Sequence, residues 1–480
     1  MIKDIYSKKI TELREKSGMS QSGFADRVNT DTETVISWEN SESVPSAEEF
    51  YKMAKLFNVS MDVFFEAEQP KTERESLDGM ESLNQLYRIG RGPSSSHTMG
   101  PEKACVLFKQ NNPDADEFKA VLYGSLAKTG KGHCTDTVIE STLSPVPCKV
   151  EFDYLKTDIE HPNTMELYAY KNGEQTDFIR VFSVGGGRIE FEGSSSAKEP
   201  IVYKLSTFKD IKAYCKEKKY RLWQYVDEVE GEYIWDYLAE VWKTMKNAVE
   251  CGIEDEGILP GGLEVQKKAK YLYNMEHIGE SAETRENREV CSYAFAVSEQ
   301  NASGGKIVTA PTCGASGVVP AVLYYMQLKH GFTDRQILQA LATGGLIGNL
   351  IKTNASISGA ECGCQAEIGT ACAMAAAALG ELFGLKRGKI EYSAEIAIEH
   401  HLGLTCDPID GLVQIPCIER NAVAAMRSIN AISLANFLTS TRKVKFDTVV
   451  ETMYQTGKDL KHHYRETSEG GLAKTYYSGN

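Results

Sequence analysis

Three cysteines in the second half of the chain carry the side chain that binds soft metal ions most readily. Cys364 lies in AECGCQAEIG, and Cys406 and Cys417 lie in GLTCDPIDGLVQIPCIERN. Zinc ribbons and ferredoxins use closely paired cysteines, whereas these three are separated by 42 and 11 positions. Spacing alone therefore leaves two interpretations open, a metal site or thiols that are simply buried. Glycines and prolines beside them could turn the backbone toward a metal.

The loop GPSSSHTMGP (92–101) is the second candidate for chemistry. Its polar side chains are Ser94, Ser95, Ser96, His97 and Thr98. Hydroxyl and backbone N–H groups packed this closely suit a carboxylate or a phosphate, and an imidazole ordinarily titrates near neutral pH. Serine-rich loops are nevertheless common, and a histidine in a loop often has no catalytic role.

Two glycine-containing segments could add to such a site. GSLAKTGKGHCTD (124–136) brings a second histidine, His133, and SVGGG (183–187) would let a backbone approach a ligand closely. Either segment could be no more than a turn.

The composition is that of a globular chain. Of 480 residues, 42% are apolar and 25% are charged, and the length suggests about three domains. A net charge of −14 disfavours nucleic acid as the main partner, because phosphate binding needs clustered lysine and arginine. The N-terminus has no secretory pattern, and the apolar stretch 371–379 is too short to span a bilayer. We expect a cytoplasmic protein with no membrane partner.

Residues 1–67 should form a compact all-α module, since apolar residues recur there at helical intervals. Residues 9–65 resemble the helix-turn-helix domain of phage-repressor-like regulators. The matching positions are Gln21, Ala25, Trp38, Glu39 and Pro45. In that family the recognition helix would begin near Asp31, which makes Gln21, Thr32 and Thr34 the candidate DNA-contacting residues.

The charge of this module opposes DNA binding. Asp31 and Glu33 stand where polar or basic side chains normally face the DNA. Residues 1–70 hold eight Lys plus Arg against thirteen Asp plus Glu, and 8 − 13 gives a net charge of −5. DNA binding and a role in dimerisation or in docking to another protein both stay open.

The rest of the chain divides by its patterns. Residues 68–79 are polar, contain a proline and are expected to be a linker. Short β-prone runs between turn signals predict an α+β domain with a sheet over 80–215. Amphipathic and alanine-rich segments separated by glycine-rich turns predict a mostly α-helical domain over 216–480, which contains the three cysteines. The predicted fold class is therefore multidomain, with a helix-turn-helix module, an α+β domain and a helical domain.

Six motifs in order along the chain resemble the bacterial iron–sulfur L-serine dehydratases in single-chain form. They are YRIGRGPSSSHTMGP, GSLAKTGKGHCTD, SVGGG, QNASGGKIVTAPTCGASGVVPAV, NASISGAECGCQAEIGTACAMAAAAL and HHLGLTCDPIDGLVQIPCIERNAVAAM. The match runs from about residue 80 to Ala473. The resemblance implies a [4Fe-4S] cluster, L-serine as substrate, pyruvate and ammonia as products, and no pyridoxal phosphate.

The same resemblance implies that Cys364, Cys406 and Cys417 are the cluster ligands. Three thiolates would leave one iron without a protein ligand and free to act as a Lewis acid. Two other cysteines stay unassigned. Cys362 could substitute as a ligand or be buried beside the cluster, and Cys313 stands where the family pattern suggests Asn.

The resemblance also places residues 94–98 at the substrate, with His133 and Asn301 as weaker candidates. We choose His97 as the base that removes the α-proton, because an imidazole titrates near the working pH. We also expect a homodimer.

Two rival hypotheses come from other classes. A transcription regulator with an inactive, serine-sensing dehydratase domain would explain the N-terminal module. A pyridoxal-phosphate dehydratase would need a Schiff-base lysine, and Lys306 in ASGGK is the candidate for it.

Overall fold

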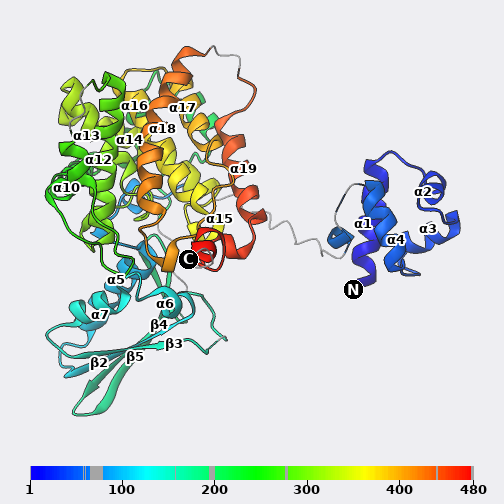
Figure 1. Cartoon of the computed structure of the whole chain (residues 1–480), viewed down its shortest axis with the longest axis horizontal. Coiled ribbons are helices and arrows are strands. Elements are labelled where there is room, and N and C mark those ends of the chain that lie inside the picture. The colour runs from blue at the N-terminus through cyan, green and yellow to red at the C-terminus, as the bar shows by residue number, and fades with distance from the viewer. Residues whose placement is uncertain are drawn as a thin grey trace. The chain divides into compact units, whose positions relative to one another are not determined.

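The computed structural model describes residues 2–57, 59, 61–64, 79–156, 158–193, 200–275, 279–438 and 442–476. The chain forms two compact units, Met1–Leu77 and Asp78–Asn480, each of which is described by itself (Figure 1).

The first unit is a small helical module, as predicted. Its helices are α1 (Ile2–Lys16), α2 (Gln21–Val28), α3 (Thr32–Glu39), α4 (Ala47–Phe57) and the 3₁₀ turn η1 (Met61–Phe64). Phe24, Trp38 and Phe50 pack in its core. The Ser20 and Asp31 side chains accept backbone N–H groups at the starts of α2 and α3, because a helix leaves its first N–H groups without intrahelical partners.

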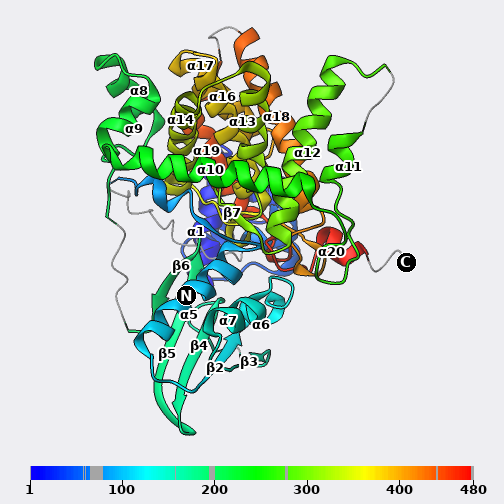
Figure 2. The same ribbon diagram turned by 90° about the vertical axis from the view of Figure 1, so that its left-hand side faces the viewer.

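The second unit contains a five-stranded sheet of order β3-β2-β4-β5-β6. The strands are β2 (Glu117–Tyr123), β3 (Cys148–Asp153), β4 (Thr164–Lys171), β5 (Glu174–Gly185) and β6 (Arg188–Phe191). Only β2 and β3 are parallel, and they are joined through α6 (Gly124–Thr129) and α7 (Thr135–Leu143). Figure 2 shows α7 and α5 (Gly100–Asn111) beside the sheet, and Phe108, Phe118 and Leu167 share the core between them.

The remainder of this unit is mostly helical. Its longer helices are α8 (Phe208–Glu217), α9 (Leu222–Glu230), α10 (Tyr233–Glu254), α12 (Ala282–Ala302), α13 (Val318–His330), α14 (Asp334–Asn354), α16 (Thr370–Leu382), α17 (Arg387–Glu399), α18 (Cys417–Phe437) and α19 (Phe446–Asp459). Shorter helices are α11 (Ala269–Asn274), α15 (Gly359–Cys362) and α20 (Gly471–Tyr476). No helix among the described residues is both long and apolar enough to cross a membrane.

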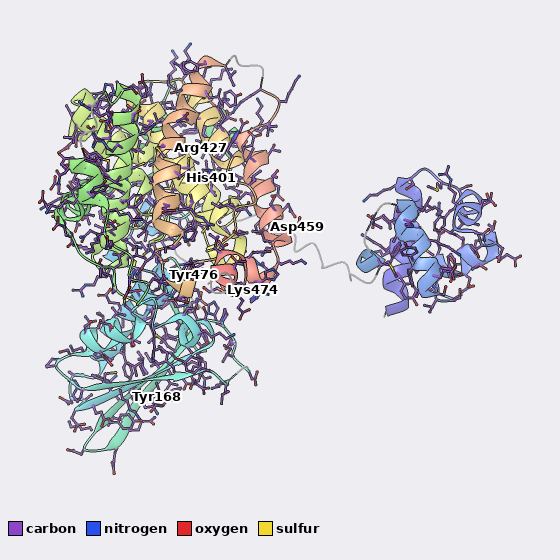
Figure 3. The ribbon with its side chains drawn as sticks, viewed as in Figure 1. Tyr168, His401, Arg427, Asp459, Lys474 and Tyr476 are labelled. Carbon is purple, nitrogen blue, oxygen red and sulfur yellow. The ribbon has the colours of Figure 1, made fainter. Side chains whose placement is uncertain are left out.

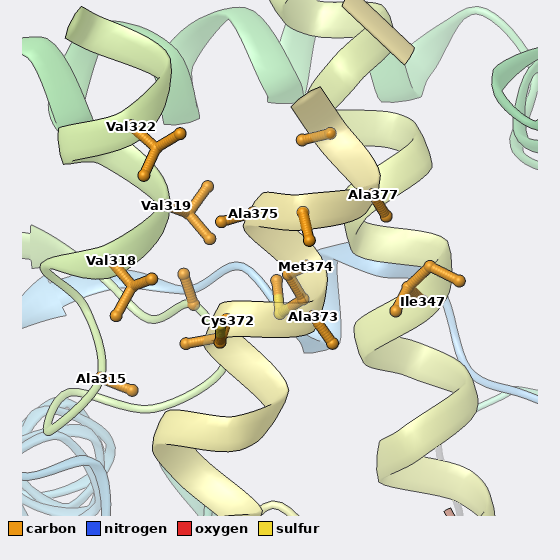
Figure 4. Close-up of a cluster of buried hydrophobic side chains, with 14 of the residues drawn as sticks. Ala315, Val318, Val319, Val322, Ile347, Cys372, Ala373, Met374, Ala375 and Ala377 are labelled. Carbon is orange, nitrogen blue, oxygen red and sulfur yellow. The ribbon is translucent and has the colours of Figure 1, made fainter. Parts of the chain in front are cut away.

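Helix α16 lies at the centre of the helical part. It packs against α13, α14, α17 and α18, and Figure 4 shows Val319 of α13 on one side of it and Ile347 of α14 on the other. Small side chains let these helices approach closely. A Cβ atom added at Gly344 of α14 would lie 2.7 Å from the Met374 carbonyl oxygen of α16, closer than packed atoms allow.

The segment before the sheet belongs structurally to the helical part. Leu83 and Tyr87 are buried in the helical core, and β1 (Ile89–Arg91) pairs antiparallel with β7 (Lys306–Val308). The candidate loop that follows β1 therefore lies where the sheet and the helices meet.

The predicted fold class is confirmed: a helical module, a sheet and then mostly helices follow one another along the chain. The predicted boundary at residue 215 stays a prediction. Of the predicted linker 68–79, all but Gly79 lies outside the described residues.

Substituting Gly344→Ala should destabilise the second unit by about 1–3 kcal/mol, because the added methyl group has no space against α16. Gly388→Ala is the matched control, since its Cβ would lie 3.7 Å from Lys212 Nζ and should be neutral or slightly stabilising. Chemical denaturation of both variants measures the difference. Equal stability of the two would contradict the packing argument.

Candidate active site

The serine-rich loop forms a single π-helical turn, η3 (Ser95–Met99), capped by Ser94. The Ser94 Oγ atom accepts the His97 backbone N–H at 3.1 Å. The two ring nitrogens of His97 lie 2.9 Å from Ser96 Oγ and 3.1 Å from Ser125 Oγ of α6. Two hydroxyl groups from different segments therefore fix the orientation of this imidazole, which is buried.

Hydrogen bonds from hydroxyl side chains to backbone carbonyls hold this turn against the sheet and α7. Ser183 Oγ donates to the Ser96 carbonyl at 2.6 Å, and Thr135 Oγ1 donates to the His97 carbonyl at 2.7 Å. Thr98 Oγ1 donates to the His133 carbonyl at 2.8 Å. The turn, the segment containing His133 and the end of β5 thus form one interlocked structure.

The two predicted histidines lie side by side, with ring centroids 4.5 Å apart and ring planes tilted by 38°. Burial lowers the pKa of His133 to about 4. Burial, and next the charge of His133, lowers the pKa of His97 well below its usual value. Both rings are therefore neutral at neutral pH, and His97 does not titrate near it as an exposed imidazole would.

Asn301, at the end of α12, lies against the same loop. Its Nδ2 atom donates to the Pro93 carbonyl at 3.1 Å. Within the described part of the chain, the buried Asn301 Oδ1 and His133 Nε2 atoms have no hydrogen-bond partner. Such atoms are costly in a folded protein, and a hydrogen bond from a bound polar molecule would remove that cost.

The predicted cysteines come together with a carboxylate that the sequence motifs did not single out. The Sγ atoms of Cys364 and Cys406 and a carboxylate oxygen of Glu367 all lie within 4.8 Å of one another. The Glu367 Oε2 atom is 3.8 Å from Cys364 Sγ and 3.9 Å from Cys406 Sγ. Glu367 follows Cys364 by three positions, and that short spacing is the signal that could have found it.

Cys417, at the start of α18, belongs to the same group. Burial, and then the charges of Cys364 and Glu367, raises the pKa of the Cys417 thiol well above its usual value. The pKa of Cys406 is also raised, first by its hydrogen bond with Cys364 and then by burial. Cys417 is thus near enough for the charges of Cys364 and Glu367 to act on its thiol, while the close group of possible ligand atoms consists of Cys364, Glu367 and Cys406.

The donor set fits a thiolate-bound metal group. Thiolates select iron–sulfur clusters, zinc or copper(I) over hard cations. A Cβ atom at Gly359 would lie 2.9 Å from Cys406 Sγ and 2.7 Å from Glu367 Oε2, so glycine leaves the space beside these donors clear. Cys364, Cys406 and Cys417 are therefore able to hold such a group.

The C-terminal segment closes over this cysteine loop. The Cys406 N–H donates to the Tyr464 carbonyl, and the Glu466 N–H donates to the Cys406 carbonyl, each at 2.8 Å. Asp407 pairs with Arg420 at 3.0 Å and accepts the Leu472 N–H at 2.8 Å. Figure 3 shows Lys474 and Tyr476 of α20 near the junction of the helices and the sheet.

Two close approaches link the histidine segments to residues near the cysteine group. The Cys313 thiol lies 4.0 Å from Met99 Sδ at the end of η3, and its pKa is raised by burial and then by the charge of Glu367. A Cβ at Gly132 would lie 3.1 Å from the Asp410 carbonyl oxygen. The segment before His133 therefore lies close to the loop between Cys406 and Cys417, and the two groups are neighbours.

Cys362 contacts a different element. A Cβ at Gly457 of α19 would lie 2.6 Å from Cys362 Sγ, so this thiol packs against α19. The Schiff-base candidate Lys306 is exposed at the start of β7.

The candidate DNA-contacting residues of the first unit make internal bonds. Gln21 Nε2 donates to Glu39 at 2.7 Å, and Thr34 Oγ1 donates to Asp31 at 2.8 Å. Thr32 is half-buried at the start of α3.

Fold and site together define a candidate metal-dependent enzyme that carries an extra helical module. Residues 121–473 match the family model of the serine dehydratase alpha chain, residues 82–151 that of the beta chain, and residues 10–64 a helix-turn-helix model. The chain belongs to the serine dehydratase family, which confirms the resemblance.

Curated relatives match over most of the chain. L-serine dehydratase 1 of Escherichia coli (strain K12) is 40% identical over 450 residues, covering 82% of this chain and 99% of the relative. The L-serine dehydratase of Haemophilus influenzae is 40% identical over 451 residues with the same coverage. That of Streptomyces coelicolor is 38% identical, covering 82% of this chain and 98% of the relative.

The buried histidine pair should make stability depend on pH. Above pH 6.5 the His133 ring is neutral in both the folded and the unfolded chain. Between pH 6.5 and about 4, His133 is protonated in the unfolded chain but stays neutral in the folded chain. The free energy of unfolding therefore falls as the pH falls. From pH 7 to pH 5, wild type should lose about 2 kcal/mol more than His133→Asn. Urea unfolding at each pH measures this, and identical pH profiles would contradict it.

Proposed function

We propose that this chain is an L-serine dehydratase, a lyase that converts L-serine to pyruvate and ammonia. Family membership and relatives named for that activity support the proposal. The observation that carries it is the close grouping of Cys364, Glu367 and Cys406, with Cys417 near enough for the charge of Cys364 to act on it.

The three cysteines would hold a [4Fe-4S] cluster. When bound, such a cluster supplies a Lewis-acidic iron that makes the substrate hydroxyl a better leaving group. Arg420 contributes positive charge to the site. Burial opposes its charged form, but the charges of Cys364, Cys417 and Asp407 outweigh burial and raise its pKa.

The histidine loop would bind and orient the amino acid. Backbone N–H groups and hydroxyls of residues 94–98 suit the substrate carboxylate, and the unpaired Asn301 Oδ1 atom suits the ammonium group as an acceptor. The unpaired His133 Nε2 atom adds a second polar contact.

His97 would take the α-proton. Its neutral ring has a free electron pair on one nitrogen, and both nitrogens face hydroxyl groups that can reorient when a substrate enters. Its depressed pKa keeps the ring in the proton-accepting form but makes it a weaker base than an exposed imidazole. Proton removal and loss of the hydroxyl as water give aminoacrylate, which tautomerises and hydrolyses to pyruvate and ammonia.

Anaerobic purification with iron and sulfide analysis, together with a pyruvate assay on L-serine, tests the proposal. Wild type should contain iron and sulfide and form pyruvate. Cys364→Ala should lose both the cluster and activity. Cys372→Ala is the matched control, because that buried thiol lies on α16 and donates to the Ala424 carbonyl of α18 at 3.3 Å. Pyruvate formation by a protein free of iron would refute the cluster.

Replacing His97→Asn should leave iron and sulfide contents unchanged and lower kcat on L-serine by about 10²–10⁴-fold, the usual contribution of a general base. His330→Asn, an exposed position at the end of α13, is the control and should retain full activity. Turnover by His97→Asn at the wild-type rate would rule this histidine out as the base.

The inactive-regulator hypothesis is not favoured, because the thiols and the histidine loop are both assembled. DNA binding by the first unit, homodimer formation and a cytoplasmic location stay predictions.

A further inference from the structure

A hollow of about 390 Å³ lies between α8, α9 and the turn that joins α16 to α17. Its charged lining residues are Lys212, Lys216, Arg221, Lys386, Arg387 and Glu381. Five cations therefore face one carboxylate, in a chain whose net charge is −14. Gathering like charges around a concavity is unfavourable without an anion to balance them.

The acidic groups nearby leave much of this charge uncompensated. Arg221 pairs with Glu381, whose pKa is raised by burial. Lys212 pairs with Glu391 at 2.5 Å, but Glu391 is shared with Arg442. Among the described residues, Lys216, Lys386 and Arg387 have no ion-pair partner, and Arg387 donates instead to the Tyr220 carbonyl.

The backbone adds to the positive potential. The hollow includes the first turn of α17, a helix of 13 residues whose N-cap Lys386 makes no side-chain capping bond. Helix N-termini present unpaired N–H groups and the positive end of the helix dipole. Lys212 Nζ lies over this turn, 3.7 Å from a Cβ atom built at Gly388.

The size and the wall of the hollow define the class of ligand. Small-molecule sites typically occupy about 300–1,000 Å³. Leu385, which is half-buried, gives this one apolar surface beside the cations, above the buried Leu222 and Ile390. Arginine and lysine side chains commonly bind phosphoryl oxygens. The apolar surface beside them would contact the organic part of a phosphorylated ligand.

The hollow is separate from the candidate active site. It lies at the C-terminal end of α16 and the N-terminal end of α17, whereas Cys364 precedes α16 and Cys406 follows α17. In Figure 2, α8 and α9 lie at the opposite side of the helical part from α20.

We propose that this hollow binds a small phosphorylated organic anion at a second site, distinct from the serine site. The phosphoryl group lies among Lys216, Lys386, Arg387 and the first turn of α17, and the organic part lies against Leu385. The inference does not depend on the activity proposed above.

Isothermal titration calorimetry of the full chain at constant ionic strength tests the site, with inorganic phosphate and AMP as probes. Wild type should bind one AMP per chain, and phosphate more weakly. The double charge reversal Lys216→Glu, Lys386→Glu should weaken AMP binding at least tenfold. Both positions are exposed, and circular dichroism verifies that the variant is folded.

The matched control is Lys103→Glu, Lys243→Glu, which makes the same change of charge at exposed positions on α5 and α10. It should bind AMP within twofold of wild type. The proposal is overturned if wild type binds neither probe, if the pocket variant binds AMP as wild type does, or if both variants weaken binding equally.

Discussion

Burial of several acidic groups around one point is the constraint on which the rest of the second unit depends. Cys364, Cys406 and Cys417 are buried, and the half-buried Glu367 and Glu466 lie near enough for their charges to raise the pKa values of Cys406 and Cys417. Burial raises the pKa of Glu466 to about 8, and the charge of Glu367 adds to that. Ionising such groups away from water is costly unless positive charge lies beside them. A cationic group held by the thiols would supply the positive charge that ionisation of these groups needs. Arg420 supplies only part of that charge.

The helical scaffold meets this constraint by placing helix ends at the site. Cys364 precedes the turn that leads into α16, and Cys417 begins α18. Helix α16 is buried on every side by helices that pack at small residues. The starts of α16 and α18 therefore cannot shift without moving the core. Rigid elements of this kind hold ligands more accurately than loops do. The remaining cysteine, Cys406, lies in a loop, and the C-terminal segment fixes it through paired backbone bonds.

The sequence predicted the elements whose signal is local. The run TMELYAY predicted the strand that is β4, and the alanine-rich stretch predicted the helix that is α16. Both signals, the alternation of apolar and polar residues and the helical periodicity, depend only on neighbouring residues. The antiparallel pairing of β1 with β7 brings Gly90 opposite Ile307, 217 positions further along the chain. Local sequence patterns do not indicate a pairing at that separation. Glu367 and Ser125 were missed for a related reason, since an acid or a serine becomes part of a site only through what the fold places opposite it.

The same distinction explains the histidines. Motif order identified His97 and His133, but their lowered pKa values follow from tertiary burial and, for His97, from the nearby charge of His133, which the local sequence does not encode. Folding leaves His133 Nε2 and Asn301 Oδ1 without partners among the described residues, at a cost of about 1–3 kcal/mol for each buried polar atom. A fold optimised for stability alone would pair such atoms or replace them with apolar groups. Their position beside a histidine held by two hydroxyls, and next to converging thiols, is what a site formed for a polar substrate requires.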